Sequence, residues 1–213
     1  LFGTSFQRDS QGRIVHETSR GYPVPVIVNN RKILGFGVPP QQIGIGASFR
    51  YKDFNAGFLI AGKSGGQIYS GTNNRLIGYG LHKMTVSAGG REAGMVPDGV
   101  LEDGSVITTS LDYAQQQAYW GRYNDAAEAG IRDSDYMRLR QLSIGYNIPS
   151  NVLEGTFIQS ASVSLIGKNL FFLSNDVENV DPESAYNSNN SQGLEFSGMP
   201  VPRTIGFNVN LKF

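Results

Sequence analysis

The feature that most constrains the fold is an unbroken alternation of apolar and polar residues over the last segment, Arg203–Phe213. Successive side chains of a β-strand point to opposite faces, so this period of two predicts a strand with one apolar and one polar face. A strand of a soluble sandwich would show the same alternation. The segment ends on Phe213 itself, without a polar tail. That ending favours a strand that faces lipid.

The same pattern recurs in four earlier segments, Gln42–Lys52, Phe54–Ala61, Tyr136–Ile148 and Ser160–Phe172. Each is expected to form a strand with one apolar face. The residues on the apolar faces of the five strands are Ile43, Ile45, Ala47, Phe49 and Tyr51; Phe54, Ala56, Phe58 and Ile60; Leu142, Ile144, Tyr146 and Ile148; Ala161, Val163 and Leu165; and Ile205, Phe207, Val209, Leu211 and Phe213. The alternation is lost at Gly167, where we expect a β-bulge.

The connections between these strands alternate between short and long. Lys52-Asp53 is a tight turn and 149–159 is fairly short, whereas Gly71–Asp135 and Ser174–Pro202 are long. Outer-membrane β-barrels have short periplasmic turns and long extracellular loops. With the C-terminus at the periplasmic end, the directions of all five strands agree with this rule. The pattern therefore predicts an antiparallel transmembrane β-barrel segment, of the all-β class, with two long extracellular loops.

Aromatic residues support this topology. Tyr51, Phe54, Tyr146 and Phe213 all fall at predicted periplasmic strand ends. Barrels carry girdles of aromatic side chains at both membrane interfaces, so we expect these four residues at one level. The rival interpretation is a soluble β-sandwich whose aromatic residues cap its core.

Composition excludes several other classes. The 213 residues include 18 basic and 18 acidic ones, so no basic excess points to nucleic acid as a partner. Cysteine is absent, which removes disulfides, cysteine-ligated zinc and thiol nucleophiles. No apolar run is long enough for a transmembrane helix. The best helical candidate, Ser110–Tyr119, lacks a clear apolar stripe.

The first 40 residues are interrupted by prolines. Residues 8–13 are predicted to form a turn between Thr4–Gln7 and Ile14–Glu17. We expect this part to be a strand or hairpin above the membrane. No signal peptide is visible at Leu1, so we expect either that it was removed or that the chain begins inside a longer polypeptide.

Three segments, in order along the chain, resemble the SusC/RagA family of TonB-dependent transporters. The first is Asp135-Tyr-Met-Arg-Leu-Arg-Gln-Leu-Ser-Ile-Gly-Tyr-Asn-Ile-Pro149. The second is Gly167-Lys-Asn-Leu-Phe-Phe172, followed by Asp181-Pro-Glu183. The third is the closing strand with Phe213, and Phe49–Phe54 is a weaker match.

This resemblance implies more than the chain contains. It implies that residues 1–213 are the C-terminal part of a large plugged barrel in the bacterial outer membrane, with the plug and the N-terminal strands outside this chain. It implies import of bulky nutrients, oligosaccharides or peptides, with a SusD-like surface lipoprotein as lid and TonB, contacted through the missing N-terminal part, as energy source. The alternative from another class is a secreted or surface all-β carbohydrate-binding or adhesin domain.

No catalytic constellation is found, so we expect neither an enzyme nor a cofactor. His16 and His82 lie far apart without metal-ligand spacing, and no Gly-x-Ser-x-Gly motif occurs. An acidic run in the second long loop, Asp176, Glu178, Asp181 and Glu183, has two interpretations. It could hold calcium or be a solvated loop. Asp181 and Glu183 are also candidates for contact with a ligand or partner in the extracellular loops. The resemblance favours a structural role for Asp181 and Glu183, with the carboxylates meeting backbone N–H groups or an arginine.

A group of aromatic residues in the first long loop also has two interpretations. Such residues can stack on sugars or anchor a partner protein, or they can form the small core of the loop itself. The group consists of Tyr113, Tyr119, Trp120 and Tyr123.

The closing strand is a candidate assembly signal. Its apolar residues Phe207, Val209, Leu211 and Phe213 are spaced for recognition by strand addition, in which alternate side chains enter pockets. We therefore expect the barrel-assembly machinery to read this segment. The simpler alternative is that Phe213 only belongs to the aromatic girdle.

Overall fold

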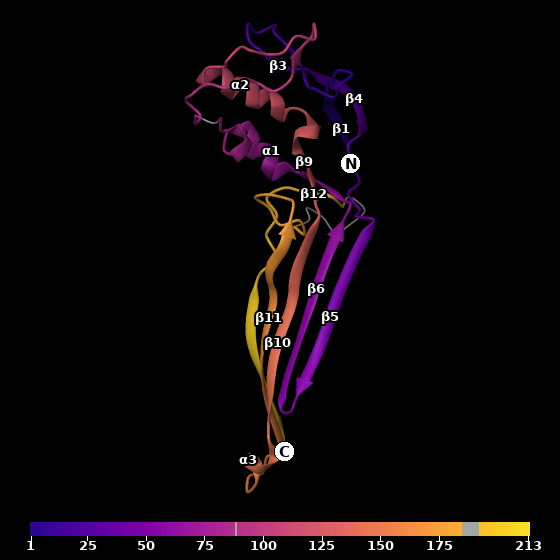
Figure 1. Cartoon of the computed structure of the whole chain (residues 1–213), viewed down its shortest axis with the longest axis vertical. Helices are drawn as coiled ribbons and strands as arrows, with labels where there is room; N and C mark the ends of the chain where they lie inside the picture. The colour runs from indigo at the N-terminus through magenta and orange to yellow at the C-terminus, as the bar shows by residue number, and fades with distance from the viewer. Residues whose placement is uncertain (88, 185–191) are drawn as a thin grey trace.

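The computed structural model describes residues 1–87, 89–184 and 192–213. A long antiparallel sheet carries a smaller domain at one end, and α3 (Ser150–Leu153) and the C-terminus lie at the other (Figure 1). The five strands of the sheet follow the order β13-β11-β10-β6-β5. They are β5 (Gln41–Tyr51), β6 (Phe54–Ser64), β10 (Tyr136–Ile148), β11 (Ser160–Asn175) and β13 (Thr204–Lys212). All five strands predicted from the alternation are confirmed.

The register joins the apolar residues of the five strands into one continuous face. Residues directly opposite each other in antiparallel strands lie on the same face of the sheet. One such row crosses all five strands: Phe49, Ala56, Ile144, Leu165 and Phe207. The four large side chains in this row each expose more than half of their surface. Such an exposed apolar surface suits contact with lipid rather than with water.

The opposite face is mainly small and polar. The next row across the sheet consists of Arg50, Asn55, Gly145, Ser164 and Asn208. Each strand therefore keeps the predicted assignment of sides, because a register slip of one residue would have mixed the two faces.

The β-bulge expected near Gly167 is confirmed slightly further along β11. Leu139 pairs with Phe171 and Gln141 pairs with Lys168, so the register shifts between them. Asn169, in this stretch, has a positive φ of 51°. On its other side β10 is irregular too, because Leu139 pairs with Ile60 of β6 and Gln141 with the adjacent Leu59. The side chain between them, Arg140, is thereby left out of the regular alternation.

The aromatic rim is only partly as predicted. Tyr51, Phe54 and Tyr146 do form one register row, and the rings of Phe54 and Tyr146 lie 4.7 Å apart. Phe213 lies outside this row, because β13 continues past the residue opposite Val163 toward Lys212. Its ring instead stacks on Phe157, at 5.6 Å between centroids. The connection after β10 therefore contacts the C-terminal aromatic ring.

The smaller domain, here called the loop domain, comprises residues 1–38, 65–134 and 192–198 as far as the structure describes them (Figure 1). Its short strands form one two-stranded and two three-stranded sheets. The strands are β1 (Phe2–Phe6), β2 (Val15–Glu17), β3 (Val24–Pro25), β4 (Ile27–Ile33), β7 (Gln67–Ser70), β8 (Val100–Leu101), β9 (Ile131–Asp133) and β12 (Leu194–Glu195). The helices are α1 (Gly71–Gly78) and α2 (Tyr113–Asn124), with 3-10 turns at η1 (Lys83–Thr85) and η2 (Ala127–Gly130).

The N-terminal prediction is right about the turn and incomplete about the pairing. Arg8 and Ile14 form a bridge, and Asp9 accepts hydrogen bonds from the backbone N–H groups of Gln11 and Arg13, which closes the turn. The main partner of β1, however, is β4, and β2 pairs with β3 and β8. Long-range pairing of this kind leaves no local signal in the sequence.

The two helices of the loop domain qualify the all-β description without changing the class. The best helical candidate in the sequence, Ser110–Tyr119, overlaps a helix that starts later and runs further, at Tyr113–Asn124. Asp112 and Gln115 form a capping box that starts it. Its weak apolar stripe is sufficient because tertiary packing stabilises short helices more than propensity does. Across the described residues, no helix is long and apolar enough to cross a membrane.

Candidate functional site

An ionic cluster joins the second long loop to the sheet. Arg138 of β10 contacts two carboxylates, Asp181 at 2.5 Å and Glu183 at 2.8 Å. Arg140 also pairs with Glu183, and the Tyr136 hydroxyl donates to the same carboxylate at 2.6 Å. Arg138 lies opposite Ala61, on the polar face of the sheet. The cluster therefore holds the loop against the polar face, at the end next to the loop domain.

Backbone and aromatic contacts complete this cluster. The guanidinium of Arg138 lies 3.9 Å from the centre of the Phe172 ring. Asp181 also accepts hydrogen bonds from the backbone N–H groups of Glu183 and Val201, each at 3.0 Å. The side chains of Arg138 and Asp181 are only 3% and 4% exposed, so the ion pair is shielded from water. This arrangement is the structural role expected for Asp181 and Glu183.

The other two acidic residues of the run do not join this cluster. Glu178 pairs with Lys83, and Asp176 is exposed. No group of three or more potential metal ligands is found in the part of the chain that the structure describes. Guanidinium groups neutralise the carboxylates at positions 181 and 183, so this cluster does not carry the calcium interpretation. The loop predicted over Ser174–Pro202 also includes residues 185–191, which lie outside the described residues.

A second buried carboxylate anchors the loop domain. Glu195 is 1% exposed and accepts hydrogen bonds from the hydroxyls of Ser70 and Thr72, each at 2.6 Å. Ser70 also caps α1 by accepting from the backbone N–H of Asn73. The partial positive charge at a helix N-terminus favours a carboxylate there. Glu195, which the sequence interpretation did not single out, thus links the second long loop to α1.

The four aromatic candidates divide between the two interpretations. Tyr119 and Trp120 are buried and pack with Ile77 and Leu111, and Tyr123 packs against this core. Tyr119 is 3% exposed, which agrees with a place in the core of the loop. Tyr113 is 64% exposed at the start of α2. Its direct contact with a ligand or partner stays a prediction.

Tyr119 instead fixes a buried histidine. The Nδ1 atom of His16 lies 3.1 Å from the carbonyl oxygen of Ile14, which can only accept, so Nδ1 carries the hydrogen. The Nε2 atom then accepts from the Tyr119 hydroxyl at 3.2 Å. Burial lowers the pKa of His16 below its usual value and raises that of Tyr119. The pair is neutral and forms part of the core.

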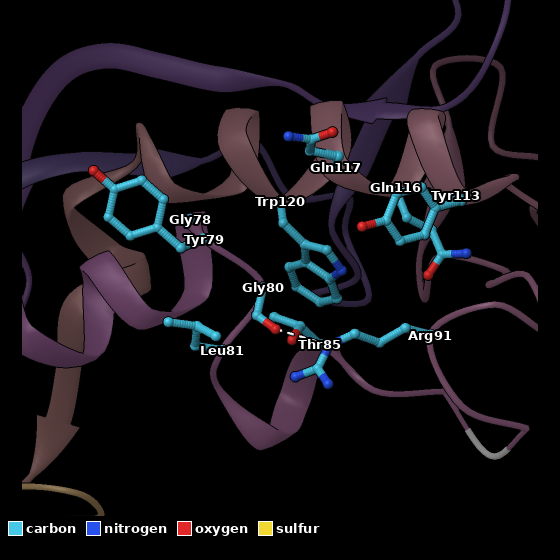
Figure 2. A pocket seen from close by; sticks show the side chains of 10 residues that line it. All are labelled: Gly78, Tyr79, Gly80, Leu81, Thr85, Arg91, Tyr113, Gln116, Gln117 and Trp120. Carbon is cyan, nitrogen blue, oxygen red and sulfur yellow. Dashed lines mark hydrogen bonds between the residues drawn. The ribbon is translucent and has the colours of Figure 1, made fainter.

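A cleft lies beside α2 and is here called the α2 cleft (Figure 2). It has a volume of about 350 Å³, in the range of small-ligand sites. The indole of Trp120 extends from α2 toward the chain that follows α1, and Arg91 donates from Nε to the Gly80 carbonyl at 2.9 Å. The residues that line the cleft are Gly78, Tyr79, Gly80, Leu81, Thr85, Arg91, Tyr113, Gln116, Gln117 and Trp120. The sequence interpretation had named two of them, Tyr113 and Trp120.

The candidate assembly residues lie on the exposed apolar face of β13 or, for Phe213, directly after its last residue. Phe207, Val209, Leu211 and Phe213 are 79%, 48%, 49% and 66% exposed. β13 pairs with β11 on one side, and in the described part of the chain it has no partner on the other. The geometry required for strand addition is therefore present, and the recognition itself stays a prediction.

Two curated relatives from Formosa agariphila match most of the chain. They are "TonB-dependent receptor P3", 28% identical over 190 residues, and "TonB-dependent receptor P26", 24% identical over 187 residues. The matches cover 86% and 85% of this chain. This chain is a relative of the TonB-dependent receptors. The chain spans only 17% and 18% of the length of these two relatives, so most of each relative has no counterpart in this chain.

Solved structures support the fold. The RagAB peptide importer in its "open-open" state matches with a TM-score of 0.64 at 15% identity, and in its "closed-closed" state with 0.62 at 14% identity. Each match covers all of this chain and 22% or 23% of the RagAB chain. No family model matches the chain.

Together these comparisons confirm the resemblance to TonB-dependent receptors and the outer-membrane location, and they show that the chain shares its fold with part of the RagAB structures. The relatives are receptors and transporters rather than enzymes, as expected.

Proposed function

We propose that this chain is the C-terminal part of the barrel of a TonB-dependent outer-membrane transporter that imports bulky nutrients. The observation that carries the proposal is the continuous, exposed apolar face across five strands, backed by a polar face. At the outer edges, β5 and β13 have no second partner among the described residues. Open edges are costly in lipid, so we expect both to pair with strands outside this chain.

The polar face lines the lumen in this proposal, and the loop domain covers its extracellular end. The ionic cluster around Arg138 then lies at the mouth of the lumen, where it positions the second long loop. The plug and the segment that contacts TonB belong to the rest of the protein. A SusD-like lipoprotein as lid, TonB as energy source, and an oligosaccharide or peptide as substrate complete the proposal.

Growth on defined nutrients tests the transport function. We expect deletion of the gene to abolish growth on one class of oligosaccharide or peptide while growth on monosaccharides and amino acids is unchanged. Deletion of TonB should have the same effect on that nutrient. Unchanged growth on every oligosaccharide and peptide of a broad panel would contradict the proposal.

The alternative of a secreted adhesin makes a different prediction about solubility. A soluble domain must cover its apolar face, and Phe49, Ile144, Leu165 and Phe207 are left exposed. We therefore expect the protein to require detergent. A monomer that melts cooperatively in plain buffer would support the adhesin instead.

Protease added to intact cells tests the topology. We expect cleavage in the loop domain and in 174–202, because the proposal places both outside the cell. The Lys52-Asp53 turn, which joins β5 to β6 at the opposite end of the sheet, should be spared until the outer membrane is permeabilised. Mass spectrometry of the fragments identifies the sites. Cleavage at Lys52-Asp53 in intact cells would invert the topology.

Deletion of Phe213 tests the assembly signal. If the residue is recognised during insertion, the deletion should sharply reduce the amount of protein in the outer membrane. Phe157→Ala is the matched control, because it removes the same ring contact and leaves the C-terminus intact. We expect near-normal insertion for Phe157→Ala. Equal amounts for both variants would assign Phe213 to interface packing alone.

A further inference from the structure

We propose that the α2 cleft binds a carboxylate-bearing sugar unit of an oligosaccharide. This inference rests on the proposed function, since it needs the loop domain to meet nutrients outside the cell. It narrows the substrate class to acidic glycans, and its support comes from the shape, the charge and the unsatisfied polar groups of the cleft.

The cleft offers flat, partly apolar surfaces. Tyr79 and Tyr113 are 74% and 64% exposed, and the largely buried Trp120 lies between α2 and the chain that follows α1 (Figure 2). Aromatic side chains supply apolar faces with polar tips, which suits the alternating C–H and hydroxyl groups of a sugar ring. Gln116 donates to the Leu111 carbonyl at 3.2 Å, which fixes its amide and leaves the amide oxygen to accept from a hydroxyl.

An indole N–H next to the cleft lacks an acceptor. Trp120 is 8% exposed, and its Nε1 atom has no hydrogen-bond partner among the described residues. A buried donor without a partner costs free energy, which an incoming oxygen atom would recover. Because the nitrogen is shielded from water, a ligand oxygen would reach it only if side chains at the rim of the cleft moved. Either a hydroxyl oxygen or a carboxylate oxygen can accept this hydrogen bond.

The charge of the cleft selects an anion. Arg91 is the one charged side chain among the described residues that line it, and no carboxylate lines it. Its Nε atom is held by the Gly80 carbonyl, so the guanidinium is oriented, and neither Nη atom has a hydrogen-bond partner among the described residues. A guanidinium forms paired hydrogen bonds with a carboxylate, which makes this group the preferred one.

The elements around the cleft favour a sugar over a peptide. The lining residues come from the end of α1, the chain that follows it, η1 and α2. None of these elements is the edge of a sheet, with which extended peptides commonly pair.

Binding of matched probes tests the inference. The full-length protein in detergent is titrated with a trigalacturonate, with its methyl ester and with a triglutamate peptide. We expect the acid to bind about tenfold more tightly than the ester, as a charge-assisted hydrogen bond to one guanidinium would give. Arg91→Gln should abolish this difference. Arg20→Gln, an exposed arginine outside the cleft, is the control and should leave it unchanged.

A second variant separates stacking from charge. Tyr113→Ala, at an exposed position, should weaken the binding of the acid and of the ester by the same factor and leave folding unchanged. Equal binding of acid and ester to the wild type, or no binding at millimolar probe, would overturn the inference. Equal binding of triglutamate would overturn the choice of a sugar. Selective binding of the acid without any growth phenotype would contradict the proposed transport function but support carboxylate binding in the α2 cleft. A growth phenotype without selective binding would contradict carboxylate binding in the cleft alone.

Discussion

Phe207→Arg is expected to destabilise the inserted protein by about 2–4 kcal/mol, because the substitution places a charge on the lipid face near the middle of β13. Phe207 pairs with Leu165 and is 79% exposed on the apolar face. The neighbouring Asn208 pairs with Ser164 on the polar face. Asn208→Arg should therefore destabilise the inserted protein far less.

Unfolding by denaturant in lipid vesicles measures both variants. The comparison is well matched, because the two positions are adjacent in one strand and receive the same side chain. Equal costs at positions 207 and 208 would contradict the assignment of the two faces. A larger cost at Asn208 would reverse it.

Arg138→Met is expected to have an effect at least as large, a loss of about 3–5 kcal/mol in the local stability of the second long loop. The substitution leaves Asp181 buried without its main counter-charge. Glu183 retains Arg140 and the Tyr136 hydroxyl. The loop should consequently detach from β10 and be cleaved by protease faster than in the wild type, while the five-stranded sheet stays inserted.

A double variant and a surface control sharpen this test. Combining Arg138→Met with Asp181→Leu removes both buried charges and should recover a large part of the lost stability. Lys83→Met breaks the exposed pair with Glu178 and should change stability by about 0–1 kcal/mol. An Arg138→Met variant whose second long loop is cleaved at the wild-type rate would show that the ionic cluster does not hold the loop.

The sequence was sufficient for the sheet and its two faces. Side chains alternate with a period of two in any strand, so the pattern around Phe49, Ile144 and Phe207 could be assigned without knowing which strands pair. The closing alternation and the tight turn at Lys52-Asp53 are also local signals. The resemblance in 135–149 and at Asp181-Pro-Glu183 identified the relatives that the comparisons confirm.

The residues of the α2 cleft could not all be predicted from local signals in the sequence. Tyr113, Tyr119, Trp120 and Tyr123 look alike in the sequence, yet Tyr119 is buried against His16 and Tyr113 is exposed. That difference depends on how α2 packs on distant segments. Arg91 joins the α2 cleft from a position far from α2 in the chain.

By itself, then, the sequence determined the five strands and the side of most of their residues, because strand geometry repeats every two residues and needs no distant partner. The resemblance of its motifs, and not this periodicity, indicated the class of relatives. Only the tertiary structure decided that Arg138 meets Asp181 and Glu183, that Glu195 meets Ser70, and that Phe213 stacks on Phe157 instead of joining the rim. These contacts join residues far apart in the chain. Their energies depend on burial and on the partner's position, neither of which is written in a local pattern.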